Sequence, residues 1–117
     1  MGKVIKANTP KSAVRLTELP SVGEKTEEYL RMVGILKPAD LIKADPFELY
    51  VQLCKETGRR FDPCLLDQFM AASSYMKGRG KKPWWHFTEE RKSKIHLIED
   101  EIKDFRKFPD PAARKKR

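Results

Sequence analysis

The first segment with the residue types for binding chemistry is Leu-Pro-Ser-Val-Gly-Glu-Lys, residues 19–25, where a tight turn leads into a helix rich in Glu and Lys. Backbone N–H groups at the start of a helix lack partners within the helix and can bind a phosphate group. The residues that would supply these donors are Ser21, Val22, Gly23, Glu24 and Lys25. The alternative is a purely structural turn, which the acidic residues of the helix favour. In either case, Gly23 is expected in the left-handed backbone conformation.

A second candidate is the loop that precedes Trp84-Trp85-His86-Phe87. Its basic residues are Lys77, Arg79, Lys81 and Lys82. In proteins that bind single-stranded nucleic acid, basic side chains contact the phosphates and neighbouring aromatic rings stack on the bases. Two adjacent Trp side chains point in different directions, so at least one of Trp84 and Trp85 is expected to be buried against the helices around the turn. Base stacking by the other ring is the functional alternative.

Residues that could bind a soft metal ion are few: Cys54, Cys64, His86 and His96. No pair of them has the spacing that places two ligands on one turn of a helix. We therefore predict no metal and no cofactor. In a reducing compartment the two cysteines are expected to be free, structural thiols, and a resting redox pair is the alternative.

No group of residues predicts catalysis. Asp67 lies in a largely apolar segment, and we expect it to be a structural, buried acid that binds an indole N–H or a helix N-terminus. No nucleophile–base pair or carboxylate dyad is recognisable for it to join, and the sequence has no phosphate-binding loop of the nucleotide-hydrolase type. The protein is therefore predicted not to be an enzyme.

Length, charge and apolar content limit the classes of protein to which this chain can belong. The 117 residues suffice for one domain with a single core, and the net charge is +8. Basic residues are concentrated in residues 1–15, in 77–82 and from Arg106 onward, whereas 16–76 is slightly acidic. This distribution suggests a polyanionic partner, with solubilising ends as the alternative. No apolar run is long enough for a membrane span or a signal peptide, so we expect a cytoplasmic protein.

Short helices separated by Pro and Gly are predicted to position these residues. The first runs from Thr9-Pro10 to Pro20 and turns two leucines inward. A second follows the turn and ends at Gly34. A third, short helix begins at Pro38. The inward-facing residues assigned to these helices are Leu16, Leu19, Thr26, Tyr29, Leu30, Val33, Leu41 and Ile42.

Two further helices have the same start signal, an Asp N-cap followed by Pro at the first helical position. These signals are Asp45-Pro46 and Asp62-Pro63, and the helices end at Gly58 and Gly78. Asp62 and Pro63 are therefore assigned a structural role. The inward-facing residues are predicted to be Phe47, Tyr50, Val51, Cys54, Leu65, Phe69, Ala72 and Met76.

The last predicted helix covers residues 88–108, begins at a Thr88 cap and carries a short apolar stripe: Ile95, Ile98, Ile102 and Phe105. This stripe is short for a coiled coil, so docking on the domain, as a monomer, is favoured over dimerisation. No strand pattern competes, and the predicted class is all-α. The expected organisation is a flexible basic arm (1–8), a helical domain (9–78), a basic aromatic loop (79–87), the last helix (88–108) and a disordered basic tail (109–117).

The turn resembles the helix-hairpin-helix motif, in which a Gly-hydrophobe-Gly turn presents backbone N–H groups to a DNA phosphate. Ser21 stands where that motif usually has its first glycine, and Glu27 where a small alanine is common. The whole segment 16–87 is similar to the bacterial pathogenicity-locus family, also described as mitomycin-resistance-type helix-hairpin-helix proteins. The residues that carry this resemblance are Leu49-Tyr50, Leu53-Cys54, Asp62-Pro63-Cys64, Asp67, Phe69 and Trp84-Trp85.

Residues 30–50 are also similar to the C-terminal domain of TfoX-type competence regulators. These resemblances imply a SAM-like helix-hairpin-helix domain with a C-terminal extension helix, and the family name suggests DNA damage or its repair. The favoured function is non-enzymatic, largely sequence-independent DNA binding through the hairpin amides and the basic termini. The alternative is a protein-interaction module with a structural hairpin and a protein partner.

Overall fold

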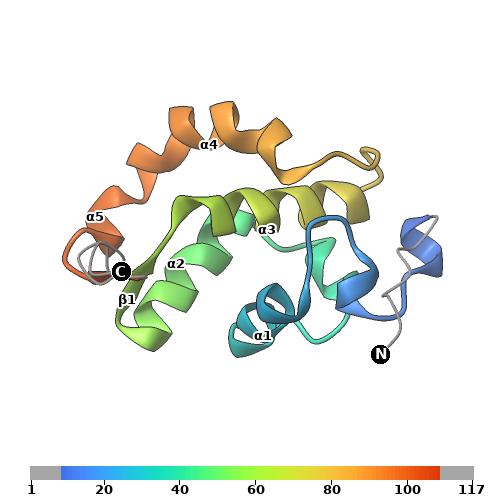
Figure 1. Cartoon of the computed structure of the whole chain (residues 1–117), viewed down its shortest axis with the longest axis horizontal. Coiled ribbons are helices and arrows are strands. Elements are labelled where there is room, and N and C mark those ends of the chain that lie inside the picture. Colours follow the sequence, from blue (N-terminus) through green and yellow to red (C-terminus); the bar gives the residue numbers. More distant parts are fainter. Residues whose placement is uncertain (1–8, 109–117) are drawn as a thin grey trace, which may run out of the picture.

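Helices and helical turns make up most of the structure, so the all-α class is confirmed. The computed structural model describes residues 9–108, and the predicted arm (1–8) and tail (109–117) lie outside the described residues. The α-helices are α1 (Glu24–Met32), α2 (Pro46–Thr57), α3 (Pro63–Met76), α4 (Thr88–Lys94) and α5 (Glu99–Ile102) (Figure 1). The 3-10 turns are η1 (Pro10–Ser12), η2 (Leu16–Glu18), η3 (Pro38–Leu41), η4 (Trp84–Phe87) and η5 (Ile95–Leu97). Between residues 9 and 108, no helix is long and apolar enough to cross a membrane.

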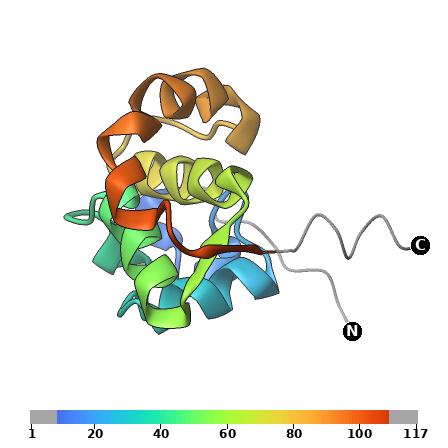
Figure 2. The ribbon, with the colours of Figure 1, turned by 90° about the vertical axis from the view of Figure 1, so that its left-hand side faces the viewer.

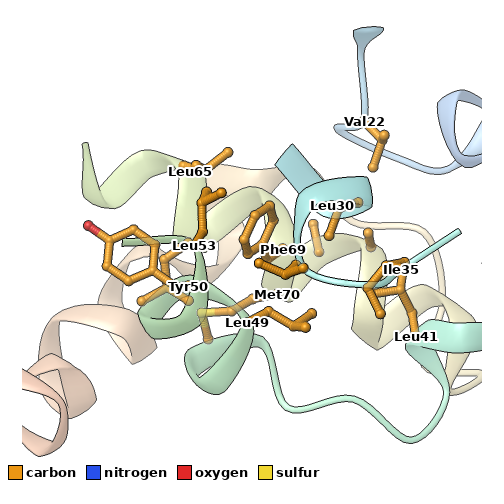
Figure 3. Packing of buried hydrophobic residues seen from close by; sticks show 14 of the residues in the cluster. Val22, Leu30, Ile35, Leu41, Leu49, Tyr50, Leu53, Leu65, Phe69 and Met70 are labelled. Carbon is orange, nitrogen blue, oxygen red and sulfur yellow. The ribbon is translucent and has the colours of Figure 1, made fainter. Parts of the chain in front are cut away.

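Helix α3 lies in the middle of the molecule, between α4 on one side and α1 and α2 on the other (Figures 1 and 2). From Leu65 to Met76, every side chain except that of Gln68 is buried. A helix that is buried nearly all round must be covered on more than one face. Its apolar residues, including Phe69, share one core with residues of α2 such as Leu53 (Figure 3).

The prediction of a helix over residues 10–19 is wrong. The chain instead makes two 3-10 turns, η1 and η2, which are joined by extended residues. The carboxylate of Glu18 accepts hydrogen bonds from the N–H groups of Val14 (2.6 Å) and Arg15 (3.0 Å). These bonds hold the pKa of Glu18 below its ordinary value and replace the helical pairing of this segment. The two predicted leucines are nevertheless buried.

The short helix predicted at Pro38 is a single 3-10 turn, η3. Leu41 is fully buried, whereas Ile42, also predicted to face inward, is 45% exposed. Ile42 follows this turn as its C-cap residue and lies outside the buried core. The prediction for Ile42 is therefore wrong.

The predicted starts of α2 and α3 are confirmed. The Asp45 carboxylate accepts a hydrogen bond from the N–H of Phe47 (2.9 Å), and the Asp62 carboxylate accepts one from the N–H of Cys64 (2.8 Å). Each cap supplies an acceptor to a helical N–H group that has no partner within the helix. Gly58 ends α2 with φ 67°, a conformation that glycine adopts without strain.

The prediction of one helix over 88–108 is wrong. The segment is divided into α4, η5, α5 and a strand, β2 (Arg106–Phe108), and Thr88 is the first residue of α4 rather than its cap. A straight helix of this length would extend about 30 Å, whereas the observed chain bends over α3 and α2 (Figure 1). The bend keeps the apolar stripe against the core, where Ile98 and Ile102 are buried.

Two short strands were not expected from the sequence. Strand β1 (Arg59–Phe61) follows α2, and β2 pairs with it in parallel (Figure 2). Each strand has three residues, which is too short for an alternating pattern to be recognised. This pairing joins the end of the described chain to the middle of the sequence.

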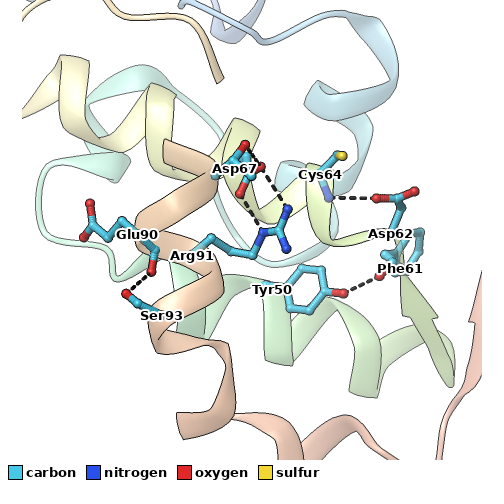
Figure 4. Close-up of polar contacts among 9 residues, drawn as sticks. Tyr50, Phe61, Asp62, Cys64, Asp67, Glu90, Arg91 and Ser93 are labelled. Carbon is cyan, nitrogen blue, oxygen red and sulfur yellow. Dashed lines mark hydrogen bonds and ion pairs between the residues drawn. The ribbon is translucent and has the colours of Figure 1, made fainter. Parts of the chain in front are cut away.

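The carboxylate of Asp67 is fully buried on α3 and binds two side chains of α4, of which Arg91 is labelled in Figure 4. The guanidinium of Arg91 donates from Nε to Oδ1 (2.9 Å) and from Nη2 to Oδ2 (3.3 Å), and the hydroxyl of Thr88 donates to Oδ2 (2.8 Å). The burial predicted for Asp67 is correct, but the predicted partner, an indole N–H or a helix N-terminus, is wrong. The carboxylate raises the pKa of Arg91, which keeps the guanidinium charged.

Removal of one side of this ion pair is expected to destabilise the protein strongly. Asp67→Asn keeps the shape and leaves the charge of Arg91 without its partner in a largely buried site, so the free energy of unfolding should fall by about 3 kcal/mol. The double variant Asp67→Leu/Arg91→Met leaves no unpaired charge and should recover part of this loss. Urea denaturation measures both, and a loss under about 1 kcal/mol for Asp67→Asn would contradict a structural role for the pair.

Candidate nucleic-acid interface

The predicted hairpin is a tight turn closed by a hydrogen bond from the N–H of Val22 to the carbonyl of Leu19 (3.2 Å). Ser21 has φ 66°, and the preceding Pro20 is the residue that type II turns favour at their second position. Gly23 instead has an extended backbone, with φ −96° and ψ −171°. The expectation of a left-handed Gly23 is therefore wrong, and Ser21 has that conformation.

Gly23 is the N-cap residue of α1 and offers no side chain to the first N–H groups of the helix. The first helical hydrogen bond runs from the N–H of Glu27 to the carbonyl of Gly23 (2.9 Å), so the amides of residues 24–26 precede the helical ladder. A Cβ atom at Gly23 would meet no heavy atom within 4 Å. The start of α1 is therefore sterically open to an anion.

Charges on α1 are partly paired with one another. Lys25 lies 3.8 Å from Glu28, and Arg31 lies 3.6 Å from Glu27, so two of the acids that oppose phosphate binding each have a basic neighbour. The hydroxyl of Thr26 donates to Gln68 on α3 at 2.6 Å. This bond fixes the first turn of α1 to the central helix.

The structure places the predicted basic loop after α3, on a different element from the turn. Lys77 has a structural contact, since its Nζ donates to the carbonyl of Ala44 (3.0 Å). Arg79 and Lys81 are exposed and Lys82 is half-buried. Gly78 and Gly80 both have positive φ, which gives the chain the sharp path that it follows here. The free ammonium and guanidinium groups of this loop are available for a phosphate, but Lys77 also holds the start of α2 in place.

The Trp pair is less buried than predicted. Trp85 is 65% exposed, Trp84 is half-buried against the core, and the buried ring of this segment is Phe87, at 8%. These residues form η4, which packs on α3 rather than on the helices around the turn. The rings of Trp84 and Trp85 meet edge to face, with centroids 5.6 Å apart. Trp85 is the ring that remains available for stacking.

Both cysteines are free thiols, with Cys54 buried in the core and Cys64 half-buried at the start of α3. Burial raises the pKa of both thiols, which lowers their reactivity at neutral pH. Within residues 9–108, no three His, Cys, Asp or Glu side chains gather as a metal site would require. The structural role predicted for these two cysteines stays a prediction.

Sequence reasoning missed Arg91 and Thr88. They lie 24 and 21 residues from Asp67, and a charged residue on a surface helix gives no local signal of a distant partner. Because these two partners of Asp67 were not identified, the way in which η4 and α4 attach to α3 could not be predicted.

The structure is that of a small, basic, all-α protein in which a tight turn precedes an open helix start. The chain belongs to the Pathogenicity locus family, whose sequence pattern matches residues 9–93. It is 44% identical over 77 residues to mitomycin resistance protein McrB of Streptomyces lavendulae, an alignment that covers 66% of this chain and 73% of that protein. No solved structure matches the chain. The family match contains the turn, the basic loop and the Asp67–Arg91 pair, and it ends within α4.

Ser21 offers a direct test of the turn. A serine in the left-handed region carries a steric cost that glycine avoids, so Ser21→Gly is expected to raise the free energy of unfolding by about 0.5–1 kcal/mol. Ser21→Val should lower it, because a β-branched residue tolerates positive φ poorly. Thermal denaturation ranks the three proteins, and a destabilised Ser21→Gly variant would show that the hydroxyl, rather than the backbone, stabilises the turn.

Alanine variants of Phe87 and Trp85 test which ring anchors η4 on α3. Phe87→Ala removes a buried ring and is expected to cost about 3–5 kcal/mol. Trp85→Ala removes an exposed ring and should cost under about 0.5 kcal/mol. Urea denaturation separates the two, and an equal loss in both variants would contradict the assignment of Phe87 as the anchor.

Proposed function

We propose that this protein is a non-enzymatic DNA-binding protein that contacts the duplex backbone through the first amides of α1. The observation that carries the proposal is the open start of α1, where Gly23 leaves the helix without a side-chain cap and leaves space above it. Helix N-termini of this kind bind phosphate through N–H donors and the partial positive charge of the helix dipole.

Two further findings support this proposal. The net charge of +8 favours association with a polyanion, and exposed basic residues occupy the loop after α3. The relative from Streptomyces lavendulae is described as a mitomycin resistance protein, which supports a role for this chain in resistance to such a compound.

Binding through backbone donors has two consequences. Such donors do not read base edges, so affinity should depend little on the base sequence. One turn contacts few phosphates, and each contacted phosphate contributes a slope of about 0.9 in log K against log salt. The basic loop and the basic ends would supply the remainder of the salt dependence.

Substitutions at Gly23 test the site. The backbone of Gly23 suits any residue, so all three variants, Gly23→Ala, Gly23→Asn and Gly23→Asp, should fold. Ala leaves the donors free, Asn caps them, and Asp caps them and adds a negative charge. We expect the affinity for a labelled duplex, measured by fluorescence anisotropy, to be unchanged for Ala, reduced for Asn and reduced at least about tenfold for Asp, as the loss of a charge-assisted contact would give.

The control for the added charge is Gln52→Glu, at an exposed position of α2. It lowers the net charge by the same amount but lies on another helix, so it should reduce affinity far less than Gly23→Asp. If Gly23→Asp binds the duplex as tightly as Gly23→Ala, the turn is structural and the proposal fails.

A second candidate function, a protein-interaction module, has one observation in its favour. A hollow of about 710 Å³ lies between η1, η3 and the end of α3. The apolar residues that line it are Pro10, Ala13, Ala39, Ile42 and Met76. Lys11 and Lys77 also line it, so it fits a segment with an apolar face and acidic residues. Ile42→Asp would weaken such binding and leave the affinity for DNA unchanged.

A further inference from the structure

Trp85 is the only Phe, Tyr or Trp side chain of residues 9–107 that is exposed. Its exposed fraction is 65%, although it lies in η4 between Trp84, which packs against the core, and the buried Phe87. Single exposed apolar side chains are common on proteins, but the indole is a large ring that is usually covered over most of its area. An exposed Trp within an otherwise packed turn is therefore a candidate for contact with a ligand.

One broad face of the Trp85 ring is open. The rings of Trp84 and Trp85 are nearly perpendicular, with an interplanar angle of 84° and centroids 5.6 Å apart. In an edge-to-face contact, one ring places its edge on one face of the other. Whichever ring supplies the edge, Trp84 covers at most one face of Trp85, so a planar group has the other face on which to stack.

The backbone of η4 holds this ring in a fixed position. The turn follows Pro83 and has a hydrogen bond from the N–H of His86 to the carbonyl of Pro83 (3.0 Å). At its end, Phe87 is buried and the hydroxyl of Thr88 donates to Asp67 (2.8 Å). A ring attached in this way loses little conformational entropy when a ligand stacks on it, since a Trp side chain has only two torsions to order.

The loop that leads into η4 supplies positive charge beside the ring. Lys81 is exposed, Lys82 is half-buried, and within residues 9–108 neither forms an ion pair. Arg79 is exposed as well, but it lines a hollow that also contains acids of α2 and α4. The two lysines are therefore the basic groups before Trp85 that are most available to a phosphate.

The acids that follow Trp85 are outnumbered. Glu89 and Glu90 lie in the first turn of α4, and Glu90 pairs with Lys94 (2.9 Å). Glu89 is exposed and has no ion pair in the part of the chain that the structure describes. The segment 77–94 contains seven basic residues against these two acids, so the surroundings of the ring favour an anionic ligand.

An open ring beside basic side chains fits a nucleobase and the phosphates that flank it. Every base has an aromatic face that can stack on an indole, whereas the phosphates of the strand attract lysine. Bases within a duplex are stacked on one another and offer no free face to a side chain. The base that Trp85 can reach is therefore an unpaired one.

Trp85 and the start of α1 are both positioned by one turn of α3. Thr88, three residues after Trp85, donates to Asp67, and Thr26 in the first turn of α1 donates to Gln68 (2.6 Å). Asp67 and Gln68 are consecutive residues of the central helix. The stacking ring and the amides proposed to bind phosphate are therefore held in a fixed relation to each other.

We infer that Trp85 is a base-stacking site that directs the protein to DNA in which a single-stranded segment adjoins a duplex. The inference rests on the proposed function, in which the start of α1 contacts the backbone of the duplex. An unpaired base stacks on the open face of Trp85, and Lys81 and Lys82 contact phosphates of the same strand. Because every base offers such a face, the preference is for the structure of the DNA and not for its sequence.

Three labelled probes separate stacking from charge: a blunt duplex, the same duplex with a single-stranded overhang, and the duplex with an overhang of abasic residues. The abasic overhang keeps the phosphates and lacks the bases. We expect the full chain to bind the normal overhang at least about fivefold more tightly than the abasic one, as one stacked base would give. Fluorescence anisotropy measures the three affinities.

Variants of Trp85 assign this difference to the ring. Trp85→Ala should bind both overhang probes equally and the blunt duplex as the wild type does, whereas Trp85→Phe should keep part of the preference. Leu97→Ala, which removes another exposed apolar side chain, at 69%, is the control and should leave all three affinities unchanged. Trp84→Phe leaves Trp85 as the only Trp of the chain, and its fluorescence should be quenched by the normal overhang and not by the abasic one.

The inference is overturned if the normal and abasic overhangs bind equally to the wild type, or if Trp85→Ala keeps the difference between them. It is also overturned if Trp85→Ala weakens binding to all three probes by the same factor, because the indole would then contact the duplex. Gly23→Asp separates this inference from the proposed function, since it should weaken all three probes equally and leave the preference intact. If Gly23→Asp has no effect and Trp85→Ala abolishes the preference, the stacking site is supported and the contact at α1 is rejected.

Discussion

The carboxylate of Asp67 is the constraint on which the arrangement of the molecule depends. It is fully buried on the central helix, and a buried carboxylate without partners would cost several kcal/mol, which its bonds to Arg91 and Thr88 avoid. Both partners lie on α4, so satisfying this acid requires α4 to cross α3 in one orientation. The same docking places Phe87 over the apolar surface of α3 and thereby fixes the preceding loop at its end. The need to pair the buried Asp67 carboxylate therefore sets the position of α4, a helix that has little apolar surface of its own.

This scaffold separates the residues that stabilise the fold from those available for binding. The central helix holds α1 in place through the Thr26–Gln68 hydrogen bond, yet the start of α1 remains uncovered. The turn before it has its strain at Ser21, so the backbone at Gly23 is relaxed and the amides that follow are presented in a fixed orientation. Donors fixed in advance lose little conformational entropy when an anion binds.

Features with local causes could be predicted from the sequence, and features with distant causes could not. The Asp-Pro starts of α2 and α3 were predicted correctly because the cap and the helix are adjacent in sequence. The broken path of residues 88–108 was missed because it follows from the surface beneath it, and an apolar stripe has the same spacing in a straight and in a bent segment. At the turn, the presence of a left-handed residue could be predicted, but glycine preference assigned it to Gly23, whereas the Leu19–Val22 hydrogen bond places it at Ser21.

The distribution of charge bears on the proposed phosphate site at the start of α1. Glu27 and Glu28 each have a basic neighbour on the same helix, which reduces their repulsion of an anion. A positive surface alone attracts any polyanion and gives it no defined orientation. The amides of residues 24–26 differ from such a surface, because the helix and the Thr26–Gln68 hydrogen bond hold them in fixed directions. A phosphate bound there would therefore have a defined position, whereas the exposed basic residues of the loop after α3 would add attraction without direction.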